Sequence, residues 1–91
     1  MKEVTVEIVN RAGLHARPAS ELVRLAGGFR SEILLEKDGL EVNGKSIMGV
    51  LMLAAECGSK LRIRAEGEDA EAALEALSGL VKKGFEEMQS G

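Results

Sequence analysis

Apolar residues follow two different periods along the chain, and each period predicts a different kind of element. In four segments they alternate with polar residues, which predicts strands with one face toward a core and one toward water. These four segments are 3–8, 33–35, 40–42 and 60–65. The pair Asp38-Gly39 between the second and third segments is typical of a two-residue turn. The alternation therefore predicts four strands, two of them joined in a hairpin.

Two longer segments carry apolar residues at helical spacing. The first begins at Pro18 and stops at Gly27-Gly28, a proline start and a glycine end that are typical of helices. Asp69 stands where an N-cap is expected before the second, C-terminal helix. The apolar stripes of the two helices are Ala19, Leu22, Val23 and Ala26, and Ala73, Leu74, Leu77, Leu80 and Val81.

A third helical segment, from Ile47 to about Leu53, is apolar nearly all round. Asn43-Gly44 ends the strand before it, and Ser46 is placed as its N-cap. A short helix on a small open sheet cannot bury every side. We therefore expect Val50 and Leu53 to enter the core and several of the other apolar side chains to stay exposed.

The predicted elements follow the order β-α-β-β-α-β-α. Alternating strands indicate an antiparallel sheet with one solvated face, and the helices must cover the other face. The fold class is therefore α+β, an open-faced two-layer sandwich. At 91 residues, with 45% apolar and 30% charged residues, the chain fits one domain over 1–91.

Composition disfavours several classes of partner. A net charge of −3, with Phe29 and Phe85 as the only aromatic residues, argues against nucleic acid. Cys57 is the sole cysteine, which leaves it a structural or incidental role, and no residues have the spacing of a metal site. The longest apolar run, 47–55, is too short to cross a bilayer, and no signal peptide is recognisable. We expect a cytoplasmic protein that does not insert into membranes.

The stretch GLHARPA at 13–19 holds the only histidine and the only proline of the chain. The predicted elements put His15 at the start of the first helix, where unpaired N–H groups and the helix dipole favour an anion. Its imidazole is a nucleophile, and Arg17 can balance the charge of a phosphoryl group carried on it. From the residues alone, a structural or surface histidine is an equally good interpretation. Hydrolase chemistry is disfavoured, because no second histidine can act as a base.

GLHARPA at 13–19 and KSIMGVLMLAA at 45–55 closely resemble the two signatures of the HPr family, the histidine-containing phosphocarriers of the bacterial phosphoenolpyruvate-dependent phosphotransferase system (PTS). The resemblance implies that enzyme I, phosphorylated by phosphoenolpyruvate, passes its phosphoryl group to Nδ1 of His15. An enzyme IIA domain then receives it, in support of sugar uptake. It also implies an active-centre role for Arg17 and a phosphate site at the backbone amides of Ala16 and Arg17. Such a protein is a phosphoryl carrier without a bound cofactor, not an enzyme with its own turnover, and a monomer is expected.

The resemblance also assigns roles around the short helix. Ser46 matches the residue that the HPr kinase/phosphorylase modifies, and a phosphate there adds about −1.5 to −2 charge to the surface. Transfer to His15 should slow if an acidic partner docks on that surface. The partner-binding residues that the resemblance implies are Ser20, Arg24, Ile47, Met48 and Leu51.

Three alternatives stay open at this stage. MLAA at 52–55 resembles carriers of the nitrogen-related branch, which feed a regulatory relay. A regulatory binding module would act through the short helix without transfer, although it would not need His15. A small-ligand-binding α+β domain would need a pocket between sheet and helices, for which the apolar residues leave little room. Gly27 and Ala12 depart from the basic and hydrogen-bonding residues that many family members have there.

Overall fold

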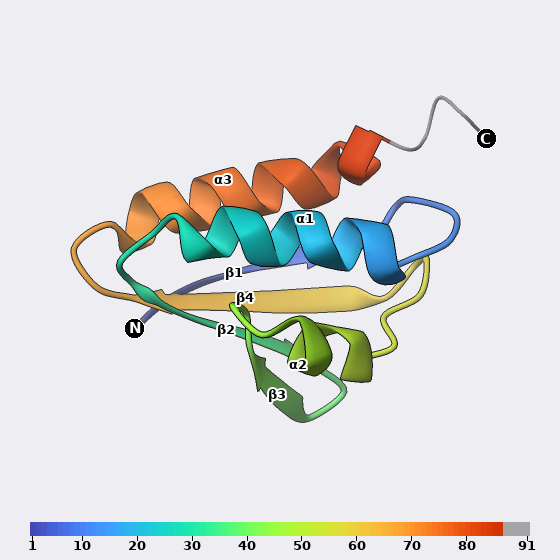
Figure 1. Ribbon diagram of the computed structural model, residues 1–91, viewed down its shortest axis with the longest axis horizontal. Coiled ribbons are helices and arrows are strands. Elements are labelled where there is room, and N and C mark those ends of the chain that lie inside the picture. Colours follow the sequence, from blue (N-terminus) through green and yellow to red (C-terminus); the bar gives the residue numbers. More distant parts are fainter. Residues whose placement is uncertain (87–91) are drawn as a thin grey trace.

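The computed structural model describes residues 1–86, which form one four-stranded antiparallel sheet with helices on one side (Figure 1). The strands lie in the order β1-β4-β2-β3, so β1 and β3 are the edges. The elements are β1 (Lys2–Glu7), α1 (Ala16–Gly27), β2 (Glu32–Lys37), β3 (Leu40–Asn43), α2 (Ile47–Met52), β4 (Lys60–Glu66), α3 (Ala70–Lys82) and the 3₁₀ turn η1 (Gly84–Glu86). The predicted element order and antiparallel sheet are confirmed.

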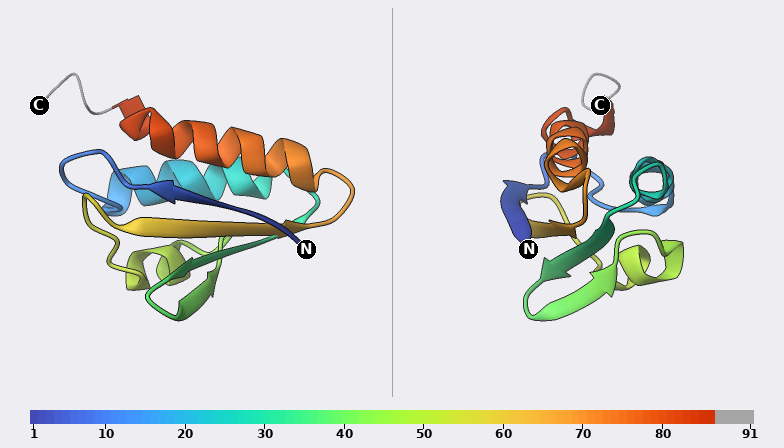
Figure 2. Two further views of the ribbon diagram at one scale, coloured as in Figure 1. Left: turned by 180° about the vertical axis from the view of Figure 1, so that it is seen from behind. Right: turned by 90° about the vertical axis from the view of Figure 1, so that its left-hand side faces the viewer.

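α1 and α3 run side by side over one face of the sheet, while the other face stays open (Figure 2). The short α2 packs against α1 and β3 at the edge of the layer. The register explains which side chains face the helices, because Ile63 of β4 lies opposite Val4 of β1 and Leu35 of β2. The open-faced two-layer sandwich is therefore the observed architecture.

The core lies between the sheet and the two long helices. It is made of the inward side chains of the strands, one stripe of each helix, and Phe85 of η1. Val50 and Leu53 are buried, as expected from the sequence. Val23, Leu74 and Leu80 are only partly buried and pack at the margin of the core, because the helices lie on an open sheet that covers one side of each.

α1 begins at Ala16, two residues earlier than Pro18 indicated, with His15 as its N-cap. Pro18 is buried in the first turn of the helix. A proline is tolerated there because first-turn N–H groups have no intrahelical acceptor. Because the helix starts at Ala16, His15 lies directly at its N-terminus.

Asp69 has a different role from the predicted one. It occupies the N-cap position of α3, but its side chain makes no capping hydrogen bond. Instead, the carboxylate accepts from the amides of Arg30 and Ser31 at 2.8 and 2.9 Å and from the Ser31 hydroxyl. It thereby ties the α1–β2 connection to the β4–α3 connection. The capping prediction was wrong because it considered only neighbours in the sequence, whereas these donors lie about 40 residues away.

These hydrogen bonds predict a pH dependence of stability. The bond from the Ser31 hydroxyl, followed by that from the Arg30 amide, lowers the pKa of Asp69 from 3.8 to about 2. Because the folded-state pKa is the lower one, Asp69 stabilises the fold above pH 3.8, and this contribution is lost as the pH falls through 2. Urea unfolding of wild type and Asp69→Asn should differ clearly at pH 6 and converge near pH 2. A difference that is constant with pH would contradict this role.

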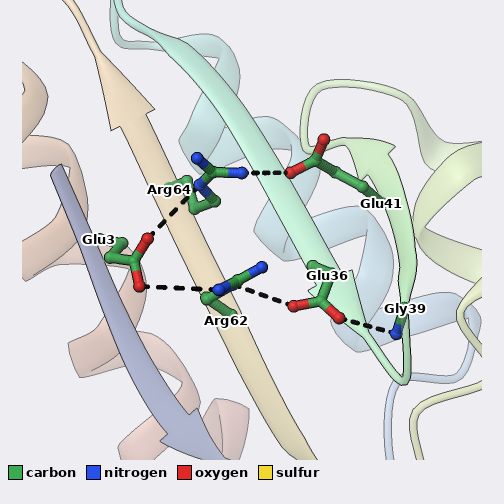
Figure 3. A network of polar contacts seen from close by, with 6 residues as sticks. All are labelled: Glu3, Glu36, Gly39, Glu41, Arg62 and Arg64. Atoms are coloured by element: carbon green, nitrogen blue, oxygen red, sulfur yellow. Dashed lines mark hydrogen bonds and ion pairs between the residues drawn. The ribbon is translucent and has the colours of Figure 1, made fainter. Parts of the chain in front are cut away.

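The open face of the sheet is covered by interlocked ion pairs (Figure 3). Arg62 contacts Glu36 at 2.9 Å and Arg64 contacts Glu41 at 2.9 Å, while Glu3 lies within 3.8 Å of both arginines. Each surface pair contributes about 0–1 kcal/mol alone, so their main consequence is a charged, well-solvated face. Apolar docking surface must therefore be sought on the helical side.

Candidate functional site

A tight loop leads from β1 to His15. Asn10 is fully buried, and its Nδ2 donates to the carbonyl of Gly13 at 2.8 Å, while the Gly13 amide donates to the Asn10 carbonyl at 3.1 Å. Gly13 has a φ of +70°, and a Cβ there would lie 2.5 Å from the carbonyl oxygen of Ala55. Only glycine fits this approach. The loop therefore rests on the segment that follows α2.

The residue before His15 anchors the loop. Leu14 is buried in the core, and its amide donates to the Ala55 carbonyl at 2.8 Å. The backbone of His15 is held on both sides, since its amide donates to Gly13 and its carbonyl accepts from Ala19, each at 2.9 Å. The residue itself is exposed, and its side chain makes no capping bond to the helix. A fixed backbone thus presents an accessible imidazole.

The first turn of α1 follows His15 directly. The amides of Ala16 and Arg17 lie in the turn where a helix has no internal acceptors, and both residues are exposed. The Arg17 side chain is 72% exposed and lies 3.9 Å from Glu21, one turn on. Such an exposed pair is weak, so it holds the guanidinium only loosely. The predicted roles of these groups are compatible with their placement.

A second site surrounds α2. Ser46 Oγ accepts from the Gly49 amide at 3.1 Å, so the predicted N-cap is confirmed. Three exposed apolar residues of the helix, Ile47, Met48 and Leu51, were expected from the sequence. Met52, which is 65% exposed, follows Met48 by one helical turn and lies beside them, although it is not among the predicted partner-binding residues. We call Ile47, Met48, Leu51 and Met52 the docking patch.

α1 borders the docking patch, because the two helices are in contact. Ser20 and Arg24 are both exposed on α1, as their predicted role requires. Patches of contiguous exposed apolar surface with methionine usually mark binding sites. The structure therefore places an apolar surface and a cationic side chain on neighbouring helices.

The N-cap of α2 gives a stability prediction. Ser46→Ala removes the acceptor for the Gly49 amide and should lower the free energy of unfolding by about 1 kcal/mol. The matched control is Ser20→Ala, an exposed serine inside α1, which should change it by less than about 0.5 kcal/mol. Urea unfolding measures both. Equal effects of the two substitutions would show that the cap contributes nothing.

Other sequence features lie apart from both sites or form no site. Cys57 is an exposed thiol with Sγ 3.8 Å from the Val9 carbonyl. Within residues 1–86, no three His, Cys, Asp or Glu residues gather in a way that could hold a metal ion. No helix in this part of the chain is long and apolar enough to span a membrane. A surface hollow of about 690 Å³ is lined by β1 and α3 residues and does not include His15.

Comparisons with known proteins agree with this geometry. A family model described as "PTS HPr component phosphorylation site" matches residues 2–83. The phosphocarrier protein HPr of Treponema pallidum is 52% identical over 83 residues, which cover 91% of this chain and 94% of that protein. The crystal structure of HPr-C-His from Thermoanaerobacter tengcongensis matches with a TM-score of 0.91 and 49% identity, covering 94% of this chain and 97% of that one.

Another similar structure is Crh of Bacillus subtilis, described as a catabolite repression protein that forms a swapped dimer. It has a TM-score of 0.74 and 44% identity, covering 92% of this chain and 97% of that one. The family match spans His15, Ser46 and every strand and long helix of the fold. The chain therefore belongs to the HPr family of bacterial phosphocarrier proteins of the phosphotransferase system.

Proposed function

We propose that His15 accepts a phosphoryl group from phospho-enzyme I and passes it to a histidine of an enzyme IIA domain. The observation that carries the proposal is the exposed imidazole on a backbone fixed at the N-terminus of α1. An imidazole nitrogen lone pair attacks phosphorus, the bond between phosphorus and the donor histidine breaks, and the donor imidazole leaves. The family resemblance favours Nδ1 as the attacking nitrogen.

Neighbouring groups support the transferred anion. The amides of Ala16 and Arg17 would donate to phosphoryl oxygens, and the Arg17 guanidinium would balance their charge. Phosphoenolpyruvate enters only through enzyme I, so the chain needs no cofactor of its own and acts as a covalent carrier. A surface site of this kind suits a group handed between two proteins.

The docking patch, with Ser20 and Arg24, is the surface on which we propose that enzyme I and enzyme IIA bind. Ser46 lies at the start of the helix that carries the patch. A phosphate on Ser46, added by an HPr kinase/phosphorylase, would place about −1.5 to −2 charge beside the apolar contact. That charge would repel an acidic partner and slow transfer to His15.

Onward transfer tests the carrier function. Phosphorylated protein, separated from enzyme I, should lose its label to an added enzyme IIA domain, and the label should appear on that domain. Retention of the label in the presence of an enzyme IIA that accepts it from another HPr would contradict the relay to that domain. A carrier of the nitrogen-related branch would be the better assignment if only an enzyme IIA of that branch accepted the label.

A regulatory binding module is the second candidate, favoured by the similarity to Crh. It predicts tight binding through the docking patch with no phosphoryl exchange at His15.

We propose a monomer in the cytoplasm for the carrier, because rapid exchange between two partners is easiest for a small free protein. Sedimentation equilibrium would distinguish it from a swapped dimer like that of Crh.

A further inference from the structure

The segment that leaves α2 contains a residue in an unfavourable conformation. Ala54 has a φ of +48°, in the left-handed region that residues with a Cβ seldom adopt. Such a conformation is unfavourable for a residue with a Cβ and persists only where surrounding contacts hold it. Glycine is the usual residue at this place after a helix.

Lys37, at the end of β2, contacts this segment. Its Nζ donates to the carbonyls of Leu53 and Ala54, at 3.3 Å each. Its side chain is only 16% exposed, although its ammonium also lies 3.6 Å from the exposed carboxylate of Asp38. The carbonyls at a helix end lack internal donors, and a lysine there also interacts favourably with the helix dipole. Lys37 therefore ties the end of α2 to the sheet.

The next residue, Ala55, contacts the loop that leads to His15. Ala55 is buried, and its carbonyl accepts from the Leu14 amide at 2.8 Å. The same carbonyl lies against Gly13, where a Cβ would approach it to 2.5 Å. The carbonyl that Lys37 binds at Ala54 is one residue from this contact, and Leu14 is one residue from His15. A short stretch of packed backbone therefore connects Lys37 to His15.

We infer that Lys37 is a positioning residue for His15, acting through the backbone of Ala54 and Ala55. By holding Ala54 in the left-handed conformation, it fixes the Ala55 carbonyl under Leu14 and thereby the start of α1. The inference rests on the proposed phosphoryl transfer. It also links the helix that carries Ser46 and the docking patch to the imidazole.

The experiment compares Lys37→Met and Lys37→Arg with Lys2→Met. Lys2 forms an exposed ion pair with Glu71 at the start of β1, whereas the loop to His15 follows the end of that strand. Lys2→Met therefore removes one positive charge at a site remote from Ala54. Lys37→Met should lower kcat for transfer from phospho-enzyme I about tenfold, because small misplacements of a reacting group slow transfer, and leave KM within about twofold. Lys37→Arg, which keeps the donors, should retain most of kcat, and Lys2→Met should match wild type.

Two further measurements separate positioning from general destabilisation. The Leu14 amide should exchange with solvent faster in Lys37→Met, while amides in the middle of β4 keep their protection. In the double variant Lys37→Met with Ala54→Gly, glycine adopts the left-handed conformation without help, so kcat should recover. An unchanged kcat and Leu14 exchange in Lys37→Met would overturn the inference and leave the proposed function standing. Failure of wild type to accept the phosphoryl group would overturn the proposed function, and Leu14 exchange would still decide whether Lys37 holds the loop.

Discussion

His15→Ala and His15→Asn are expected to accept no phosphoryl group from phospho-enzyme I, while both remain folded. His15 is the only histidine of the chain, so no other imidazole can replace it as acceptor. Because the residue is exposed, its replacement should cost no more than about 1 kcal/mol of stability. Intact-mass measurement after incubation with phosphoenolpyruvate, magnesium and enzyme I gives the result directly.

The two variants control for each other. Asparagine is a good N-cap residue and alanine is a poor one, so the variants should differ in stability but share the complete loss of labelling. Circular dichroism would verify that each keeps its helices. Labelling of either folded variant would show that the acceptor is a different side chain and would remove the basis of the proposed function.

The second large effect is expected at Arg17. Arg17→Ala should slow phosphoryl transfer about 10²-fold, because it removes a charged donor that faces the developing charge of the transferring group. Arg17→Lys should recover part of the rate, since a lysine keeps the charge but loses the planar fork of donors. Single-turnover transfer from phospho-enzyme I at saturating concentration is the appropriate measurement.

Arg24 provides the matched comparison, because it is another exposed arginine of the same helix, two turns from Arg17. As a residue that borders the docking patch, it should affect encounter with an acidic partner. Arg24→Ala should therefore raise KM and weaken its dependence on salt, with the saturated rate nearly unchanged. If Arg17→Ala changed only KM in the same way, Arg17 would be a docking residue and would not stabilise the transferred group.

Most of the fold could be predicted because apolar residues recur along the chain at regular strand and helix spacing. The strands of the open sheet have one wet face, which keeps apolar and polar residues in strict alternation at Val4, Val6 and Ile8. The predicted start of α1 at Pro18 is two residues late, because a proline is tolerated throughout the first turn of a helix and not only at its first residue.

The support of the candidate site could not be predicted, because it depends on contacts between distant loops. Gly13 and Leu14 meet Ala55 about 40 residues along the chain, and no local pattern marks that meeting. Asn10 offered a weak signal as a carboxamide between a strand and a glycine, a residue type that often organises loops. Asp69 shows the same limit, since its local position indicated a cap while its actual donors come from the α1–β2 connection.

The most direct test of phosphoryl transfer to His15 is nitrogen NMR of protein labelled with ¹⁵N only in histidine. The chain has one histidine, so every imidazole signal belongs to His15. After addition of phosphoenolpyruvate, magnesium and a catalytic amount of enzyme I, the Nδ1 signal should shift and show coupling to phosphorus, and acid should reverse the change. Unchanged imidazole signals, with the same enzyme I active on another HPr, would contradict the account.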